Sequence, residues 1–472
     1  MSIPATILSF DLKNIQSTNR LIGLWRLLTG FRLKYLIATL SLGIAAAAKT
    51  ATYLLLRYFV DNFFVNQFNP LPLWKIAAGF VILALVEGGF SFLSGRLAAQ
   101  TSEGITRRLR NYLFDHIQHL SFSYHRQMET GELIQRATSD VDAIRRFFAD
   151  QAINVGRIVM LFIINFIALL KLNVTLAFLS IVIIPLIMLI SVQFFKRVSK
   201  AYEAYQEQDA SLSTTLQENL TGVRVVKAFA RQQFEIQKFE RDNWEKYQRG
   251  KRLLKMHSLF WPISDTLCGL QMVVGFLVAA VMAIQGVITP GSYLANVGLV
   301  VWIIFPIRNL GRLIVQASSG MISYQRVIEI IREEREPLDE GDYQPGHGIR
   351  GEIIFENVCF EYEHDNIVLK DISFQCKPGQ VIALLGSTGS GKTTLVNLLP
   401  RFFDYTGGRI LLDGVELKRY PRRYLRQQIG IVEQEPFLFS RSIRENIIYS
   451  VGRDVPQQEI ENVARAAAIH DV

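Results

Sequence analysis

Six apolar runs set the strongest limit on how this chain can fold. They cover residues 35–60, 75–95, 152–171, 174–195, 260–286 and 293–316. At 1.5 Å per helical residue, each run is long enough to cross about 30 Å of hydrocarbon. Half of the 472 residues are hydrophobic, which is too many for an ordinary soluble protein. We therefore expect an all-α transmembrane domain of six helices within residues 33–330.

The basic residues predict how these helices are oriented. Residues 61–74, between the first two runs, contain no lysine or arginine, whereas the segments after the second and fourth runs contain many. By the positive-inside rule, these two segments, both termini and the last third of the chain are cytoplasmic, and the protein is integral to the cell (inner) membrane. The net charge of +9 fits such a face. Nucleic acid is not an expected partner, because basic and aromatic residues are not interleaved.

The two basic segments, residues 96–151 and 196–255, are far longer than simple links. A solvated charged hairpin would explain their charges, but not the apolar residues that recur every three or four positions. We therefore predict that the membrane helices continue into both segments and return. These stripes are Leu109, Leu113, Ile117 and Leu120 in the first segment, and Leu216, Leu220, Val223 and Val226 in the second. The N-terminal segment is residues 1–32, and residues 20–34, which begin in it, have the basic-aromatic pattern of an interfacial elbow helix.

A glycine-rich stretch late in the chain predicts a nucleotide site. Residues 381–399 read as an apolar strand, a loop and a helix, and the loop fits the pattern G-x-x-x-x-G-K-[ST]. Glycines let successive backbone N–H groups face an anion, the lysine adds a charge for phosphates, and the threonine hydroxyl suits Mg²⁺. A glycine-rich turn before a helix is the plainer alternative, and the lysine and its context disfavour it. The loop residues are Gly386, Ser387, Thr388, Gly389, Ser390, Gly391, Lys392, Thr393 and Thr394.

Three segments resemble the half-transporter ABC exporters, in which a permease is fused to an ATP-binding domain. Residues 113–148 and 216–240 are similar to the two intracellular loops of that family, and residues 323–334 to the end of its sixth helix. After a polar linker at 331–350, the stretches IIFENVCFEY and IVLKDISFQC resemble the start of its nucleotide-binding domain. The resemblance runs from about residue 20 to the end. It places this chain in the branch that contains bacterial lipid flippases and multidrug exporters.

The resemblance implies roles for individual residues. Tyr362 matches the aromatic residue that stacks on adenine, and residues 386–394 match the phosphate loop. Gln434 matches the glutamine that lies near Mg²⁺ and the attacking water, so Thr393 and Gln434 are the expected metal ligands. An aromatic ring suits a purine and a neutral amide can both bind metal and orient water. ATP and Mg²⁺ are therefore the expected cofactors.

Members of this family work as pairs. Two half-transporters sandwich two ATP molecules, and the closure moves the helices from inward-open to outward-open. We expect a homodimer, or a heterodimer if a matching half exists. The segments 122–138 and 221–229 match the contacts that dock on the nucleotide domains.

The family pattern is not complete within residues 351–472. This stretch of about 120 residues is roughly half of what the family's fold needs, and it contains no LSGGQ-like signature, Walker B run or switch histidine. The sequence thus predicts an incomplete α/β P-loop nucleotide-binding domain that binds ATP weakly and does not turn it over alone. We favour a C-terminally truncated fragment or gene model of an ordinary exporter. The alternative is a short, non-hydrolysing ATP-binding subunit with a partner or regulatory role.

Charged residues within the apolar runs bear on the cargo. Lys49 and Glu87 lie within the first and second spans, and charges at such depth usually face a wet cavity or the protein interior. Lys49 could instead snorkel to an interface. A direct Lys49–Glu87 pair is not expected, since counting residues from opposite membrane faces places them about 10 Å apart in depth. Arg308 and Arg312 would add charge at the cavity mouth or hold lipid phosphates. We predict an amphipathic, anionic cargo such as a lipid or lipid-linked glycan, with a drug as the alternative.

Overall fold

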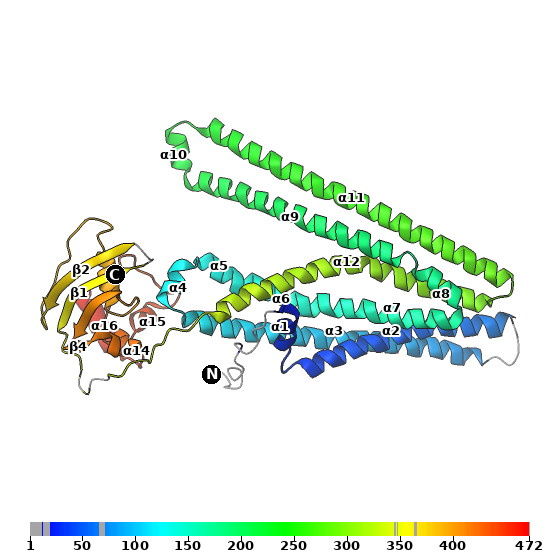
Figure 1. Cartoon of the computed structure of the whole chain (residues 1–472), viewed down its shortest axis with the longest axis horizontal. Helices are drawn as coiled ribbons and strands as arrows, with labels where there is room; N and C mark the ends of the chain where they lie inside the picture. The colour runs from blue at the N-terminus through cyan, green and yellow to red at the C-terminus, as the bar shows by residue number, and fades with distance from the viewer. Residues whose placement is uncertain are drawn as a thin grey trace. The chain divides into compact units, whose positions relative to one another are not determined.

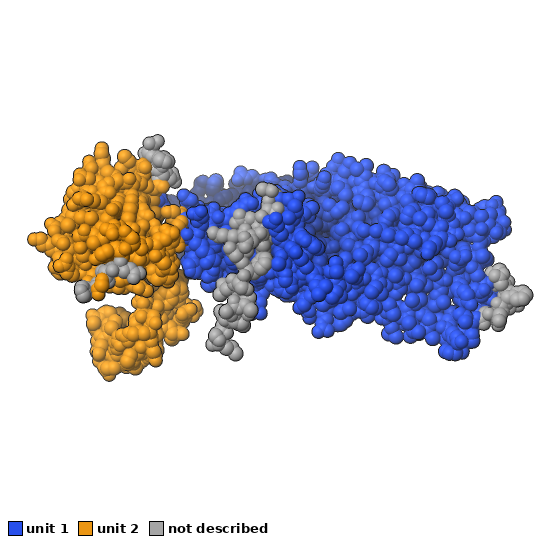
Figure 2. Space-filling view, turned by 60° about the horizontal axis from the view of Figure 1, so that its bottom comes forward, with its two compact units in different colours: residues 1–120, 124–335 blue, residues 121–123, 336–472 orange. Residues whose placement is uncertain are grey.

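The structure is a computed structural model of the chain, and it describes residues 12, 19–65, 71–343, 346, 348–362 and 366–471. The chain divides into two compact units, which Figure 2 shows in blue and orange. The first unit contains residues 1–120 and 124–335, and the second contains residues 121–123 and 336–472. Most of the predicted N-terminal segment before residue 19 lies outside the described residues, as does part of the predicted linker 331–350.

The first unit is entirely helical in its described residues. Six helical stretches are long and apolar enough to cross a membrane, which confirms the six predicted spans. The helices are α1 (Arg20–Leu27), α2 (Arg32–Val60), α3 (Leu73–Gln118), α4 (Phe122–Gln127), α5 (Thr130–Gln135), α6 (Val141–Arg146), α7 (Ala152–Leu172), α8 (Val174–Ile181), α9 (Ile184–Thr221), α10 (Val223–Ala228), α11 (Gln232–Ile284) and α12 (Pro290–Arg332). Short π-helical turns cover Asp61–Val65, Arg136–Asp140 and Phe147–Gln151.

Local capping explains where the membrane helices end. Asn173 is extended (φ −164°, ψ 126°), so it ends α7, and its side chain accepts a hydrogen bond from the backbone N–H of Leu176 at 3.1 Å to begin α8. Thr289 caps α12 in the same way through the N–H of Ser292, and Pro290 occupies the first helical position, where its missing N–H costs nothing. The capping residues in the sequence therefore explain why the chain reverses between α7 and α8 and before α12.

Helices α2 and α12 pack closely near the link between α2 and α3. A side chain at Gly298 would collide with the Tyr53 ring, so only glycine permits this approach. Closer to the link, the buried Asp61 carboxylate accepts the N–H of Gly291 at 2.8 Å and the Thr289 hydroxyl at 2.6 Å. These bonds fix the start of α12 against the end of α2.

Two helical hairpins extend beyond the apolar runs, as the sequence predicted. We call residues 96–151 the first hairpin and residues 196–255 the second hairpin. In the first, Leu109, Leu113 and Leu120 are buried in a core shared with α12. In the second, Leu216 and Leu220 are 48% and 67% exposed. Figure 1 shows α9 and α11 running away from α12 toward their tip at α10.

The second unit is built on a four-stranded antiparallel sheet of order β2-β1-β3-β4. The two stretches expected to form its first strands do pair, and the rings of Phe355 and Phe374 stack across them at 4.5 Å. The core beneath the sheet includes Leu398, Ile410 and Leu425. The elements are β1 (Ile353–Glu361), β2 (Ile367–Cys376), α13 (Lys392–Leu398), β3 (Gly407–Leu412), β4 (Val415–Glu416), a 3₁₀ turn (Leu417–Arg419), α14 (Arg422–Gln428), α15 (Ile443–Ile447) and α16 (Gln457–Ala466).

The strand predicted to precede the phosphate loop is not formed, so that prediction was wrong for this structure. Residues 381–386 have no regular secondary structure, and Val381 and Leu385 are more than 90% exposed. A strand forms only where neighbouring strands pair with its backbone groups. No described strand pairs with this segment, and a space of about 400 Å³ lies between it and side chains of β2 such as Leu369 and Phe374.

Candidate functional site

The phosphate loop adopts the conformation that its glycines permit. Gly389 and Gly391 have φ values of 87° and 88°, which side chains other than glycine rarely adopt. A side chain at Gly391 would also lie 2.7 Å from the Leu369 methyl group. The Lys392 ammonium donates to the backbone carbonyls of Gly386 and Ser387 at 2.9 and 2.7 Å. The loop thus curls around its own lysine at the start of α13.

Tyr362 lies beside this loop. Its hydroxyl is 2.9 Å from the hydroxyl of Thr394, in the first turn of α13. Its half-buried ring meets Phe360 and Phe403 edge to face, with centroids 4.7 and 5.1 Å apart. The structure therefore brings the predicted adenine platform and the phosphate loop together.

The two predicted metal ligands, Thr393 and Gln434, lie in different segments of the second unit. Thr393 is exposed at the start of α13, and Gln434 is exposed in the irregular segment before α15. Within the described part of the chain, Gln434 makes no hydrogen bond with the phosphate loop. Hydroxyl and amide oxygens are nevertheless donors that Mg²⁺ accepts, together with water and phosphate oxygens. The donor chemistry of these two side chains fits the ion.

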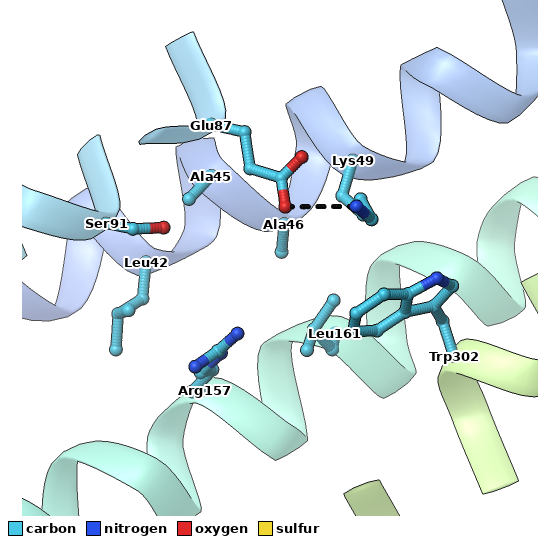
Figure 3. A pocket seen from close by; sticks show the side chains of 9 residues that line it. All are labelled: Leu42, Ala45, Ala46, Lys49, Glu87, Ser91, Arg157, Leu161 and Trp302. Carbon is cyan, nitrogen blue, oxygen red and sulfur yellow. Dashed lines mark ion pairs between the residues drawn. The ribbon is translucent and has the colours of Figure 1, made fainter. Parts of the chain in front are cut away.

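Lys49 and Glu87 form a direct ion pair, which corrects the expectation from sequence. The Lys49 Nζ atom lies 3.3 Å from Glu87 Oε1 (Figure 3). The expectation counted depth from opposite membrane faces, whereas α2 and α3 are antiparallel neighbours joined by one link. Counted from that link, Lys49 is eleven residues before Val60 and Glu87 fourteen after Leu73, or about 16 and 21 Å deep. Two long side chains readily bridge that difference.

A small pocket surrounds this ion pair, between α2, α3, α7 and α12. Its volume is about 20 Å³, enough for about one water molecule. The Lys49 ammonium lies 4.7 Å from the centroid of the Trp302 ring, whose indole N–H donates to the Tyr53 hydroxyl at 2.8 Å. The pocket is lined by Leu42, Ala45, Ala46, Lys49, Glu87, Ser91, Arg157, Leu161 and Trp302.

Sequence reasoning missed Arg157 in this pocket. The residue lies inside the third predicted span, so the rule that drew attention to Lys49 and Glu87 should also have found it. In Figure 3 its side chain points from α7 toward the space beneath Ala46. Trp302 could not have been found in the same way, because an aromatic residue in a membrane span is ordinary.

Arg308 is paired rather than free, contrary to the expectation of added charge. Its guanidinium bonds to Asp265 of α11 and lies 5.0 Å from the centroid of the Trp261 ring. An opposite charge cancels most of its field at a distance. Arg312, one turn further along α12, is exposed.

Phe122, the first residue of α4, belongs to the second unit, where its ring stacks on Phe402 with centroids 4.5 Å apart and meets Phe403 edge to face at 5.7 Å. Phe403 also touches Tyr362. A chain of aromatic contacts thus connects Phe122 to the side chain beside the phosphate loop.

Comparisons with known proteins agree with these features. The chain matches the model of the ABC transporter transmembrane region over residues 35–307 and that of the ABC transporter domain over residues 369–472. It is 32% identical to YgaD of Bacillus subtilis, named as a multidrug export ATP-binding/permease protein, over 93% of this chain and 77% of that protein. It is 29% identical to an ATP-dependent lipid A-core flippase of Syntrophus aciditrophicus, over 93% of this chain and 72% of the flippase.

Proposed function

The chain belongs to the ABC transporter family, and from that membership we propose that it exports or flips an amphipathic substrate across the cell membrane at the expense of ATP. One observation carries this proposal: six membrane-crossing helices and an ATP-binding loop occur in a single chain. The nucleotide unit and both termini are proposed to be cytoplasmic, because the hairpins that extend from the apolar runs carry the arginines and lysines.

We assign the nucleotide contacts to the residues that the fold gathers around α13. Residues 386–394 would hold the phosphates, and the Lys392 ammonium would exchange loop carbonyls for phosphate oxygens. Tyr362 would support the adenine. Thr393 and Gln434 would hold Mg²⁺, which supplies charge neutralisation at the phosphates.

We propose that the working unit is a dimer of half-transporters, with a homodimer as the simplest form. Six spans and one nucleotide unit are half of the family's working set. The exposed stripe of the second hairpin supports this assignment, since apolar side chains outside the membrane are usually covered. Val225 and Phe229, at the tip of that hairpin, are 60% and 74% exposed and are candidates for docking on a nucleotide unit.

The cargo is proposed to be a lipid, lipid-linked glycan or drug. The relatives are named for lipid A-core flipping and for multidrug export, which supports a lipid or a drug as the cargo. The charged pocket around Lys49 supports an anionic headgroup, because ionisable side chains within hydrocarbon are costly unless they serve a site.

ATP binding tests the nucleotide assignment. A fluorescent ATP analogue should bind the purified protein, and Lys392→Ala should weaken binding about 10- to 100-fold, since a charged hydrogen bond is lost. Lys377→Ala, a nearby lysine outside the loop, is the matched control. Equal binding of the ATP analogue by the Lys392→Ala variant and the unaltered protein would contradict the assignment of the phosphates to this loop.

Transport tests the proposed activity itself. Proteoliposomes should contain the protein together with any segment that follows residue 472 in its gene. They should move fluorescent anionic lipids in an ATP-dependent way, and Lys49→Ala and Arg308→Ala, which leave the carboxylates of Glu87 and Asp265 without these partners, should slow anionic more than cationic amphiphiles. If both variants move the two classes unchanged, the charge argument fails and the general exporter assignment remains.

A further inference from the structure

The pocket between α2, α3, α7 and α12 contains three ionisable side chains, of which Lys49 and Arg157 are positive and Glu87 is negative. Lys49 and Glu87 neutralise each other, and their side chains are 26% and 31% exposed. Arg157 is exposed, and no carboxylate among the described residues lies within ion-pair distance of it. The pocket therefore carries one net positive charge, located on Arg157.

Arg157 lies at the same depth as the ion pair. It is fifteen residues from the end of α7 at Leu172, or about 22 Å, while Glu87 is about 21 Å from the start of α3. Arg157 is the sixth of the 21 residues of α7, so it lies within the apolar run, about 8 Å from the start of that helix. An uncompensated guanidinium at this depth is costly in hydrocarbon, so a compensating anion from outside the chain is favoured there.

The shape of the pocket determines where such an anion can bind. The enclosed space holds about one water, so a headgroup cannot enter behind the ion pair. Figure 3 shows the Arg157 guanidinium, the Ser91 hydroxyl and the Glu87 carboxylate around the same space, and Arg157 and Ser91 are exposed while Glu87 is partly buried. The Glu87 carboxylate repels any second negative charge that enters this space.

We propose that Arg157 binds the single negative charge of a monoanionic amphiphile, and that Glu87 determines this charge selectivity by holding Lys49 and opposing dianionic headgroups. This inference rests on the proposed function for its choice of an amphiphile, and it narrows the substrate class from anionic to singly charged. A planar guanidinium suits the paired oxygens of a phosphodiester or carboxylate.

Binding of lipids that differ only in headgroup charge tests this proposal. The purified protein is placed in detergent micelles doped with phosphatidylcholine, phosphatidylglycerol or phosphatidic acid of equal chain length. Bound lipid is counted by native mass spectrometry, at pH 9 so that the phosphate monoester is dianionic. Phosphatidylglycerol should bind about 10- to 100-fold more tightly than phosphatidylcholine, and phosphatidic acid no more tightly than phosphatidylglycerol.

Variants assign the effect to individual residues. Arg157→Gln should reduce phosphatidylglycerol binding to the level of phosphatidylcholine, and Arg157→Lys should keep the preference. Glu87→Gln, which leaves two positive charges, should make phosphatidic acid the tightest ligand. Lys171→Gln, at the far end of α7 and outside the pocket, is the matched control and should change nothing.

Several results would overturn the proposal. Equal binding of phosphatidylcholine and phosphatidylglycerol would do so, as would a preference that survives Arg157→Gln. Saturable binding of inorganic phosphate that depends on Arg157 would identify a free anion rather than an amphiphile as the ligand. The assay contains no ATP, so selective binding without ATP-driven movement would refute the proposed transport alone, and the reverse result would refute this site alone.

Discussion

The first and second hairpins are built alike but differ in what covers their apolar side chains. Each continues a membrane helix outward and carries apolar residues at helical spacing. In the first hairpin, Leu109 and Leu113 are buried against Val327 and Ile331 of α12. In the second, Leu216 and Leu220 face outward from α9. The same sequence signal therefore produced an internal core in one place and an exposed surface in the other.

This difference indicates which parts of the molecule are complete within one chain. The leucine stripe of the first hairpin is buried within the chain, although Phe114 and Ile134 of the same hairpin are 69% and 59% exposed. The second hairpin has ion pairs such as Lys238–Glu218, but its leucine stripe is exposed. Burying one leucine contributes about 1.5–3 kcal/mol, so a surface of this kind favours association with another chain. We interpret it as part of the proposed interface between half-transporters.

The largest expected effect is a difference in the loss of stability between a variant of the first stripe and a variant of the second. Leu113→Ala should destabilise the monomer by about 2–5 kcal/mol, because it removes a fully buried side chain and leaves a cavity. Leu220→Ala should change stability by less than about 0.5 kcal/mol, because Leu220 touches mainly solvent in one chain. Equilibrium unfolding of the two variants in detergent, at concentrations where the protein is monomeric, measures both values. Equal losses of unfolding free energy in the two variants would contradict the claim that only the first stripe is buried within one chain.

Association of two chains, in contrast to stability, should depend on the exposed stripe of the second hairpin. Leu220→Ser should weaken association of two chains about 10-fold or more, since an apolar contact across the interface is lost. Ser213→Ala, on an exposed part of the same helix, should leave association unchanged. The dissociation constant from analytical ultracentrifugation in detergent distinguishes the two variants. An unchanged constant for Leu220→Ser would place the stripe outside the interface.

The smallest effects concern the charges of the two hairpins. Arg136, in the first, is 11% exposed and bonds to Glu132 at 2.5 Å and to Glu329 of α12 at 3.2 Å. Arg136→Gln should cost about 1–2 kcal/mol of unfolding free energy, reduced by the partial exposure of both carboxylates.

Lys238 of the second hairpin is the matched control for Arg136. Its Nζ atom lies 3.4 Å from Glu218, and the Glu218 side chain is 62% exposed. Lys238→Gln should cost less than about 0.5 kcal/mol in the same unfolding assay. A larger cost for Lys238→Gln than for Arg136→Gln would show that the second hairpin, not the first, depends on its ion pairs.

Periodicity and length were enough to predict the six spans and the helical hairpins, and the family resemblance predicted the first strand pair. They could not predict which stripe is buried, because the spacing of Leu109 and Leu113 is the same as that of Leu216 and Leu220. The covering surface comes from α12, more than two hundred residues further along the chain from the first stripe. Secondary structure is local, whereas burial depends on such distant partners.

The functional sites show the same difference between local features, which the sequence predicts, and features that depend on distant parts of the chain. The phosphate loop was recognisable because its backbone conformation requires particular residues in consecutive positions. The strand before it was not formed, since a strand depends on neighbours that no local pattern specifies. Depth counting failed for the Lys49–Glu87 pair because the two helices were measured from different faces, while measurement from their shared link gives nearly equal depths.

Labelling of single cysteines tests the central claim most directly, namely that the second hairpin is covered by another copy of the chain. Cys268, Cys359 and Cys376 are replaced by alanine, and one cysteine is introduced by Leu113→Cys or Leu220→Cys. The rate of reaction with a water-soluble maleimide is measured in dilute detergent and in proteoliposomes at high protein density. We expect slow labelling at position 113 in both conditions, and labelling at position 220 that is fast in dilute detergent and at least about tenfold slower in proteoliposomes. Equally fast labelling at position 220 in both conditions would contradict it.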